Sequence, residues 1–112
     1  MNYTKEQIIE AVRAGKAAAI IAGNESYAQI GERDACGFAW VSVAVGRTNS
    51  KEAKALIEAG FRKDYRPRSL CLWDPAGLPT QSITPKEAGA RAMAEVLRER
   101  LGLDAYAGSR LD

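Results

Sequence analysis

The chain has 112 residues, so a second domain would leave each half near the lower size limit for independent folding, and we expect one domain covering residues 1–112. Hydrophobic residues make up 46% and charged residues 27% of the chain, a balance that argues against intrinsic disorder. With 16 basic and 14 acidic residues the net charge is +2, which is too weak a field for tight nonspecific binding to nucleic acid.

The longest apolar run, residues 17–22, is too short to span a bilayer, and the polar start of the chain lacks the apolar segment of a secretory signal. We therefore expect a cytoplasmic protein without membrane contact. Cys36 and Cys71 lie in apolar runs without metal-ligand spacing, so we expect buried, reduced thiols and no metal or other cofactor. The sequence contains no histidine, which excludes Ser-His and Cys-His nucleophile pairs. We expect a non-enzyme, although chemistry by carboxylates or tyrosine alone stays open.

The N-terminal segment predicts a short helix followed by a strand. Thr4 is a suitable N-cap with Gln7 three residues later, and Gly15 is suited to end the helix, so we expect a helix over residues 5–14. Residues 18–22 then predict a short strand.

Residues 23–26 predict a turn, and residues 27–35 predict a connector with at most one helical turn. The strand that follows carries the strongest β signal in the sequence. In residues 36–45 Phe38 and Trp40 share one face, and valines occupy the other. Because both faces are apolar, we expect this strand to be central.

A second helix is predicted after the turn at residue 46. Asn49 is a suitable N-cap with Glu52 in the return position, and Gly60 is suited to end this helix. Residues 61–69 are polar and contain a proline, which predicts an exposed loop before a strand at residues 70–73.

The C-terminal third predicts a turn, a long helix and a last strand. Residues 74–79 contain two prolines and a glycine, which excludes regular structure. Thr84 as N-cap and Pro85 as first helical residue predict a helix that continues to about Leu101. Residues 104–110 predict a short final strand.

These elements predict an α+β fold, with a small twisted, mainly antiparallel sheet of three to four strands packed with about three helices. We expect the helices on one face of the sheet. Part of the other face would then stay uncovered, which favours a homo-oligomer, a dimer or larger.

Three segments carry groups suited to an anionic or planar ligand. Arg47 and Ser50 lie at the start of the second helix, where free backbone N–H groups can bind phosphate, although a plain helix cap explains the segment equally well. The basic loop at residues 61–69 holds aromatic residues and precedes Trp73, which suits base stacking and phosphate pairing. Solvated charge and aromatic anchoring to the core are the alternatives there. Arg110 lies in a tail that suits a ligand contact or a frayed end.

Four runs of sequence resemble small proteins encoded by bacteriophages and prophages. They are ACGFAWV at residues 35–41, LWDPAGLPTQS at 72–82, KEAGARAMAEVL at 86–97 and AYAGSR at 105–110, together about a third of the chain. Among such proteins the chain is most similar to the Thoeris anti-defence sponges, which capture cyclic ADP-ribose signals, and in some members cyclic oligonucleotides, without degrading them. The resemblance implies an α+β oligomer with ligand pockets between subunits, lined by aromatic and arginine residues.

The function predicted from this resemblance is sequestration of a cyclic nucleotide immune signal by a phage-encoded protein in the host cytosol. The alternatives are a phage accessory protein that binds nucleic acid or a host protein, and a small nucleotide hydrolase. The ligand-binding residues are chosen from their chemistry, since no family motif of ligand contacts aligns with the chain. For base stacking and phosphate pairing they are Phe61, Arg66, Arg68, Trp73, Arg91 and Arg110, with Arg47 and Ser50 as a second anion site.

Overall fold

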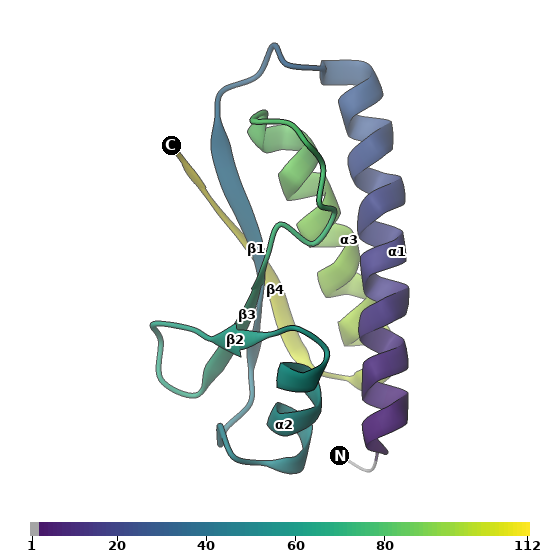
Figure 1. Ribbon diagram of the computed structural model, residues 1–112, viewed down its shortest axis with the longest axis vertical. Helices are drawn as coiled ribbons and strands as arrows, with labels where there is room; N and C mark the ends of the chain where they lie inside the picture. The colour runs from purple at the N-terminus through teal and green to yellow at the C-terminus, as the bar shows by residue number, and fades with distance from the viewer. Residues whose placement is uncertain (1–2) are drawn as a thin grey trace.

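The computed structural model describes residues 3–112, which form three helices and one four-stranded sheet (Figure 1). The α+β fold class predicted from the sequence is confirmed. In chain order the elements are α1 (Lys5–Ile30), β1 (Gly37–Ala44), α2 (Lys51–Glu58), β2 (Arg62–Lys63), β3 (Ser69–Trp73), α3 (Ile83–Leu101) and β4 (Asp104–Leu111).

The sheet has the strand order β2-β3-β1-β4, and all neighbouring strands are antiparallel. β1 is therefore internal, as its two apolar faces predicted. β4 pairs with β1 along its whole length, from Ala44 opposite Asp104 to Gly37 opposite Leu111. Figure 1 shows α1 and α3 side by side on one side of the sheet, while the turn between β2 and β3 projects away from them. Within residues 3–112, one face of the sheet is thus left without a helix.

The predicted helix over residues 5–14 and the strand over residues 18–22 are wrong, because both segments belong to the single 26-residue helix α1. Thr4 does cap this helix, and its side chain accepts a hydrogen bond from the N–H of Gln7 at 3.1 Å. Alanine has the highest helix propensity, so the alanine-rich run extends the helix rather than forming a strand. The helix ends at Gly31, which adopts a φ of 63°.

Two glycines inside helices are close contact points between α1 and α3, and one of them, Gly15, was predicted to end a helix. A Cβ at Gly15 would lie 2.8 Å from Cγ of Met93 on α3. On α3, a Cβ at Gly89 would lie 3.1 Å from the carbonyl oxygen of Ala19 and 2.9 Å from Cβ of Ala76. A glycine inside a helix costs about 1 kcal/mol relative to alanine, and close packing of the two helices offsets that cost here.

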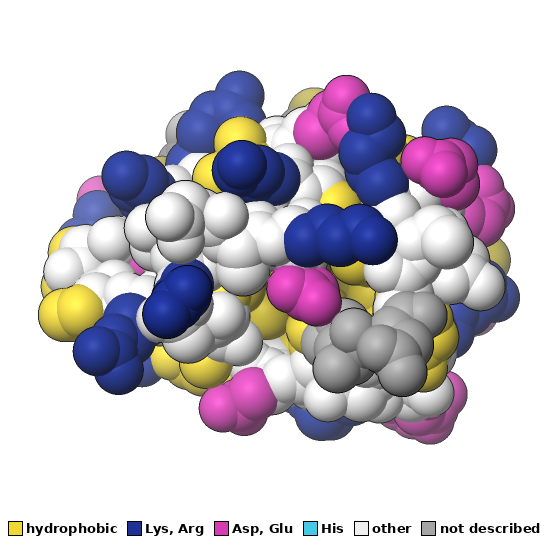
Figure 2. All heavy atoms as spheres, turned by 90° about the horizontal axis from the view of Figure 1, so that it is seen from below, with side chains coloured by type: hydrophobic (Ala, Val, Ile, Leu, Met, Phe, Trp, Pro, Cys, Tyr) yellow, Lys and Arg dark blue, Asp and Glu magenta, His cyan; other side chains and the backbone are white. Residues whose placement is uncertain are grey.

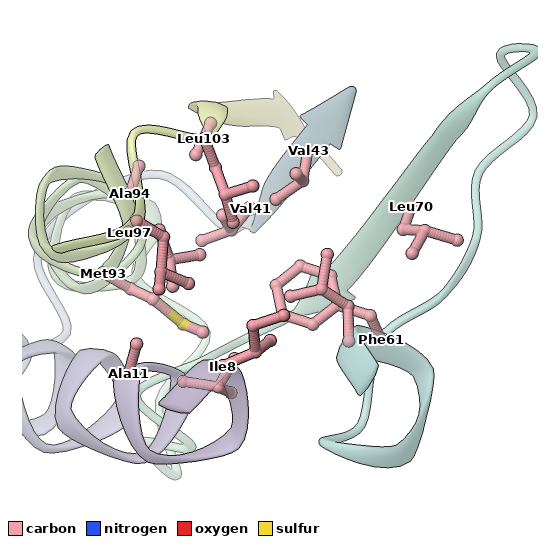
Figure 3. Packing of buried hydrophobic residues seen from close by; sticks show 14 of the residues in the cluster. Ile8, Ala11, Val41, Val43, Phe61, Leu70, Met93, Ala94, Leu97 and Leu103 are labelled. Carbon is pink, nitrogen blue, oxygen red and sulfur yellow. The ribbon is translucent and has the colours of Figure 1, made fainter. Parts of the chain in front are cut away.

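The core lies between the helices and the covered face of the sheet. Val41 and Val43 of β1 are fully buried there, and Met93 of α3 fills the space between the two long helices (Figure 3). In the same view Ile8 of α1 and Phe61, which follows α2, point toward one another. Phe61 is 0% exposed, so its ring ties the start of β2 to the core.

The starts of α2 and α3 differ from their predicted caps. Ser50, not Asn49, caps α2, and its side chain accepts a hydrogen bond from the N–H of Ala53 at 3.1 Å. α3 begins one residue before Thr84, and the N–H of Thr84 donates to Oδ2 of Asp34 at 3.0 Å. Its first turn is therefore stabilised by a carboxylate from a distant part of the sequence.

The predicted exposed loop at residues 61–69 is a hairpin. β2 pairs with β3 through Arg62 opposite Cys71 and Lys63 opposite Leu70, and only residues 64–68 form the turn. The expectation of two buried thiols holds for Cys71, whereas Cys36 is exposed. Within residues 3–112 no helix combines the length and apolarity needed to cross a membrane.

Candidate ligand-binding site

The uncovered face of the sheet collects aromatic and arginine side chains from three strands. Alternation along β1 buries Ala39, Val41 and Val43 in the core and places Phe38 and Trp40 on the opposite face. Cross-strand partners lie on the same face of a sheet. The partners on this face are Trp73 of β3 and Gly108 of β4 opposite Trp40, and Arg110 of β4 opposite Phe38. We call this surface the open face.

Two tryptophans form the centre of the open face. The rings of Trp40 and Trp73 are 4.8 Å apart between centroids and tilted by 35°. Trp40 can lie close to β4 because residue 108 is glycine, and a Cβ there would come within 2.5 Å of Cε2 and Nε1 of the indole. Trp73 is 48% exposed, so a large aromatic surface is open to solvent. Such a surface suits the stacking of a planar ring.

A guanidinium lies at one edge of this aromatic cluster. Cζ of Arg110 is 5.6 Å from the ring centroid of Phe38 and 5.8 Å from that of Trp73, distances typical of cation–π contacts. Phe38 in turn contacts Trp73 edge to face, with 6.0 Å between centroids. Arg110 thus combines a fixed position with a positive charge that can pair with phosphate.

The turn of the β2-β3 hairpin reaches over the open face to β4. Arg66 donates hydrogen bonds to the hydroxyl of Tyr106 on β4 and, at 3.2 Å, to the hydroxyl of Tyr65. The hydrogen bond to Tyr65, followed by the electrostatic effects of Tyr106 and Tyr65, raises the pKa of Arg66 above its already high ordinary value. Tyr65 itself is 83% exposed. The turn therefore forms one wall of the site, and its Arg66 side chain remains positively charged.

Asp64 lies at the other end of the aromatic cluster from Arg110. One carboxylate oxygen accepts the N–H of Tyr65 at 2.7 Å, and the other accepts the hydroxyl of Ser42 at 3.4 Å. Burial, followed by the charge of Asp64, raises the pKa of the Cys71 thiol. The raised pKa favours the thiol form of Cys71, which lies opposite Ser42 and is a weaker nucleophile than a thiolate.

The side chains of the open face enclose a cavity of about 260 Å³. It is large enough for a planar heterocyclic ring. Its lining consists of Trp40, Trp73 and Tyr65, with Asp64 and Arg110 as the charged groups. The arrangement is suited to binding a flat ligand by stacking, with a hydrogen-bond acceptor and a cation at different positions along the cavity.

Three of the residues predicted from the sequence, Arg66, Trp73 and Arg110, are brought together at this site. Phe61 is not part of it, and its predicted stacking role is wrong because a ring that is 0% exposed cannot contact a ligand. Arg91 lies at an exposed position of α3, the helix on the other side of the sheet, so it cannot reach the open face.

The predicted second anion site forms a separate hollow of about 460 Å³ at the start of α2. Arg47 and Arg68 both line it, the latter with a left-handed backbone at a φ of 60°. Ser50 does not line it, because its hydroxyl caps the helix. Figure 2 shows the lower end of the molecule in the orientation of Figure 1, and there Lys and Arg side chains are spread apart with acidic side chains between them. Among the described residues seen in this view, the basic side chains do not form one continuous patch.

Sequence reasoning missed Trp40, Tyr106 and Asp64 as site residues, and it considered Tyr65 only as an aromatic residue of the basic loop. The alternation in β1 does place Phe38 and Trp40 together, but it gives no sign that the opposite face alone is covered by helices. The contact between Arg66 and Tyr106 joins positions 40 residues apart. No local pattern predicts such a pairing.

Comparison of the chain with protein-family models, curated proteins and solved structures gave no match. Among residues 3–112, no three His, Cys, Asp or Glu side chains are grouped so that they could hold a metal ion. The function proposed below therefore depends on the geometry and chemistry of the open face.

Proposed function

We propose that the chain binds a nucleotide-derived small molecule on the open face and holds it without chemical change. The supporting observation is the aromatic cavity between Trp40, Trp73 and Tyr65, with Arg110 beside it. Stacking of a base on aromatic rings is worth about 1–3 kcal/mol per base, and an arginine adds charge-assisted bonds to phosphate.

Within this class we propose a cyclic nucleotide immune signal, such as a cyclic ADP-ribose isomer, sequestered by a phage-encoded protein in the host cytoplasm. The four sequence runs that resemble the anti-defence sponges support this choice. Three of them supply residues of the open face, namely Phe38 and Trp40, Trp73, and Arg110.

The test is calorimetric titration with cyclic ADP-ribose isomers, cyclic di- and trinucleotides, NAD and short oligonucleotides, followed by chromatography of the recovered ligand. We expect tight binding of one cyclic nucleotide, recovered unchanged after heat denaturation of the protein. Arg110→Ala should weaken binding at least about tenfold, because it removes a charge-assisted bond. Arg91→Ala is the matched control, since it removes the same charge on the other side of the sheet. Failure of every nucleotide to bind, or recovery of a cleaved ligand, would reject the proposal.

A second candidate function is binding of single-stranded nucleic acid. Its specific support is that exposed aromatic rings come from β1, β3 and the hairpin turn, so stacking positions extend across the sheet. Affinity for an oligonucleotide should then fall steeply with salt, because several phosphates would be neutralised. A ligand of one nucleotide unit should show a much weaker salt dependence, which separates the two functions.

We also propose a homo-oligomer that forms through β4. This eight-residue edge strand pairs with β1 on one side and has no neighbouring strand on the other among residues 3–112. The carbonyl of Ala105 accepts a hydrogen bond from Arg98 at 2.8 Å, whereas the N–H of Asp112 bonds to Cys36 ahead of β1. Odd-numbered residues of β4 therefore direct their backbone groups outward.

Ala107→Pro tests this assembly because proline removes an outward N–H and leaves the pairing with β1 intact. Sedimentation velocity should show a dimer or larger species for the native chain and a monomer with unchanged circular dichroism for the variant. A native chain that sediments as a monomer at all concentrations would reject the assembly.

A further inference from the structure

The two ends of the open face carry opposite charges, and this difference restricts the chemistry of the ligand. Asp64 bonds to Ser42, whereas Arg110 lies opposite Phe38, four residues earlier on β1. At about 3.3 Å per residue, the positions of Ser42 and Phe38 are separated by roughly 13 Å along β1. Trp40 lies between them. A ligand that fills the site meets an acceptor at one end, aromatic rings in the middle and a cation at the other end.

The acceptor end carries the Asp64 carboxylate, whose charge contributes, after the larger effect of the Tyr65 hydrogen bond, to the raised pKa of the nearby Arg66 guanidinium. Asp64 forms no salt bridge within residues 3–112, although several basic residues surround it in the sequence. The neighbouring guanidinium of Arg66 is bonded to Tyr65 and Tyr106 instead. Each oxygen of the Asp64 carboxylate accepts one hydrogen bond and retains a further lone pair. The carboxylate can therefore accept N–H groups from the edge of a ligand and interact with a positive charge.

The aromatic walls favour a positively charged ring over a neutral one. A cation over the face of an aromatic ring is attracted by the ring quadrupole, and tryptophan is the strongest of the three aromatic residues in this respect. Trp40, Trp73 and Tyr65 line the cavity together with Asp64 and Arg110, and Arg110 and Arg66 already place guanidinium groups near Trp73 and Tyr65. A neutral purine would gain the stacking contribution only. A purine that carries a positive charge would gain stacking, the cation–π contribution and a charge-assisted bond to Asp64.

We propose that the open face selects a nucleotide whose purine ring is N-alkylated and positively charged, with the ring between Trp40, Trp73 and Tyr65, its N–H edge at Asp64 and its phosphate at Arg110. This inference rests on the proposed nucleotide-binding function and names its ligand class. It includes a cyclic ADP-ribose that closes through N1 of adenine, because that bond leaves the ring alkylated and charged. Isomers that close through ribose oxygens leave the adenine neutral and are expected to bind more weakly.

Matched pairs of nucleotides that differ by one methyl group test the inference by calorimetry at neutral pH. The pairs are AMP with 1-methyl-AMP, and GMP with 7-methyl-GMP. We expect the charged member of each pair to bind roughly tenfold more tightly, in the range that cation–π and charge-assisted contacts supply. Choline serves as a cation without a ring or phosphate. If choline binds as tightly as the methylated nucleotides, the site is a general cation cage and the inference is wrong.

Asp64→Asn keeps the shape of the side chain and removes its charge. In this variant the affinity for the methylated nucleotides should fall far more than that for AMP and GMP, so that each ratio drops well below ten and only the cation–π contribution of the rings remains. A ratio that stays near ten in Asp64→Asn would overturn the role of Asp64. Equal affinities within both pairs for the native chain would overturn the selectivity but leave the nucleotide-binding function intact. Absence of binding by all four nucleotides would reject that function as well.

Discussion

The indole of Trp40 lies against the backbone of Gly108, where a Cβ would come within 2.5 Å of the ring atoms Cε2 and Nε1. Trp40 is held between this glycine and Trp73, so the floor of the open face depends on the absence of a side chain at residue 108. Because the Trp40 ring lies on the uncovered side of the sheet, we expect a change in this contact to affect ligand affinity more than the stability of the fold.

Gly108→Ala should displace the Trp40 ring and weaken ligand binding by about 1–2 kcal/mol, the order of one stacking contact. Near-ultraviolet circular dichroism should report the changed geometry of the two tryptophans, and calorimetry the loss of affinity. In a Trp40→Ala background the same substitution should cost little, because no ring is left to displace. Equal losses in the two backgrounds would show that residue 108 acts without Trp40.

Phe61→Ala should destabilise the fold by about 3–5 kcal/mol, as expected for removal of a fully buried aromatic side chain. Trp73→Ala removes a half-exposed ring and should cost much less stability while weakening ligand binding more strongly. Urea unfolding measures the first effect and calorimetry the second. The reverse ranking would place Phe61 at the site and Trp73 in the structural core.

Gly89→Ala should destabilise the protein by about 1–3 kcal/mol, although alanine is the better helix former. The added Cβ would lie 3.1 Å from the backbone oxygen of Ala19 and 2.9 Å from Cβ of Ala76, and neither atom belongs to a flexible side chain. Gly15→Ala is the comparison, because its Cβ would meet the side chain of Met93, which can rotate away at lower cost. An increase in the unfolding midpoint of Gly89→Ala would contradict the close packing of α1 and α3.

Stability should fall with acid through the carboxylate of Asp34. Hydrogen bonds from the Thr84 side chain and from the N–H of Ala35 lower the pKa of Asp34 in the folded protein. A lowered folded pKa means that the unfolded chain takes up the proton first. The contribution is therefore complete above the ordinary aspartate pKa and is lost as the pH falls through the folded value.

Thermal unfolding of the native chain and of Asp34→Asn across the acidic range checks this prediction. The midpoint of the variant should change less with pH in that window, and the two curves should converge at the lowest pH. A constant difference between the two curves would mean that Asp34 stabilises the start of α3 without titrating.

The sequence by itself determined the elements whose signals are local. Alternation over residues 36–45 predicted the central strand β1, and periodicity with a terminal glycine predicted α3 up to Leu101. From chemistry alone it also predicted one site made of six residues, of which the structure brings Arg66, Trp73 and Arg110 to the open face but not Phe61, Arg68 and Arg91. The same local rules failed in α1, where Gly15 was predicted to end a helix and Gly23 to begin a turn after a strand. The structure uses both as contact points for side chains of other segments, Met93 and Leu78.

Only the tertiary structure decided which face of the sheet is covered, and therefore which aromatic rings are available to a ligand. Phe38 and Trp40 are as apolar as the valines on the other side of β1, and their neighbours in sequence do not distinguish the two faces. The distinction arises because α3 packs against the valine side of β1 and α1 packs on α3, while Arg66 and Tyr106 close over the other side. Which face is buried depends on contacts between segments that are distant in the sequence. The sequence pattern shows only that successive side chains of β1 alternate between its two faces.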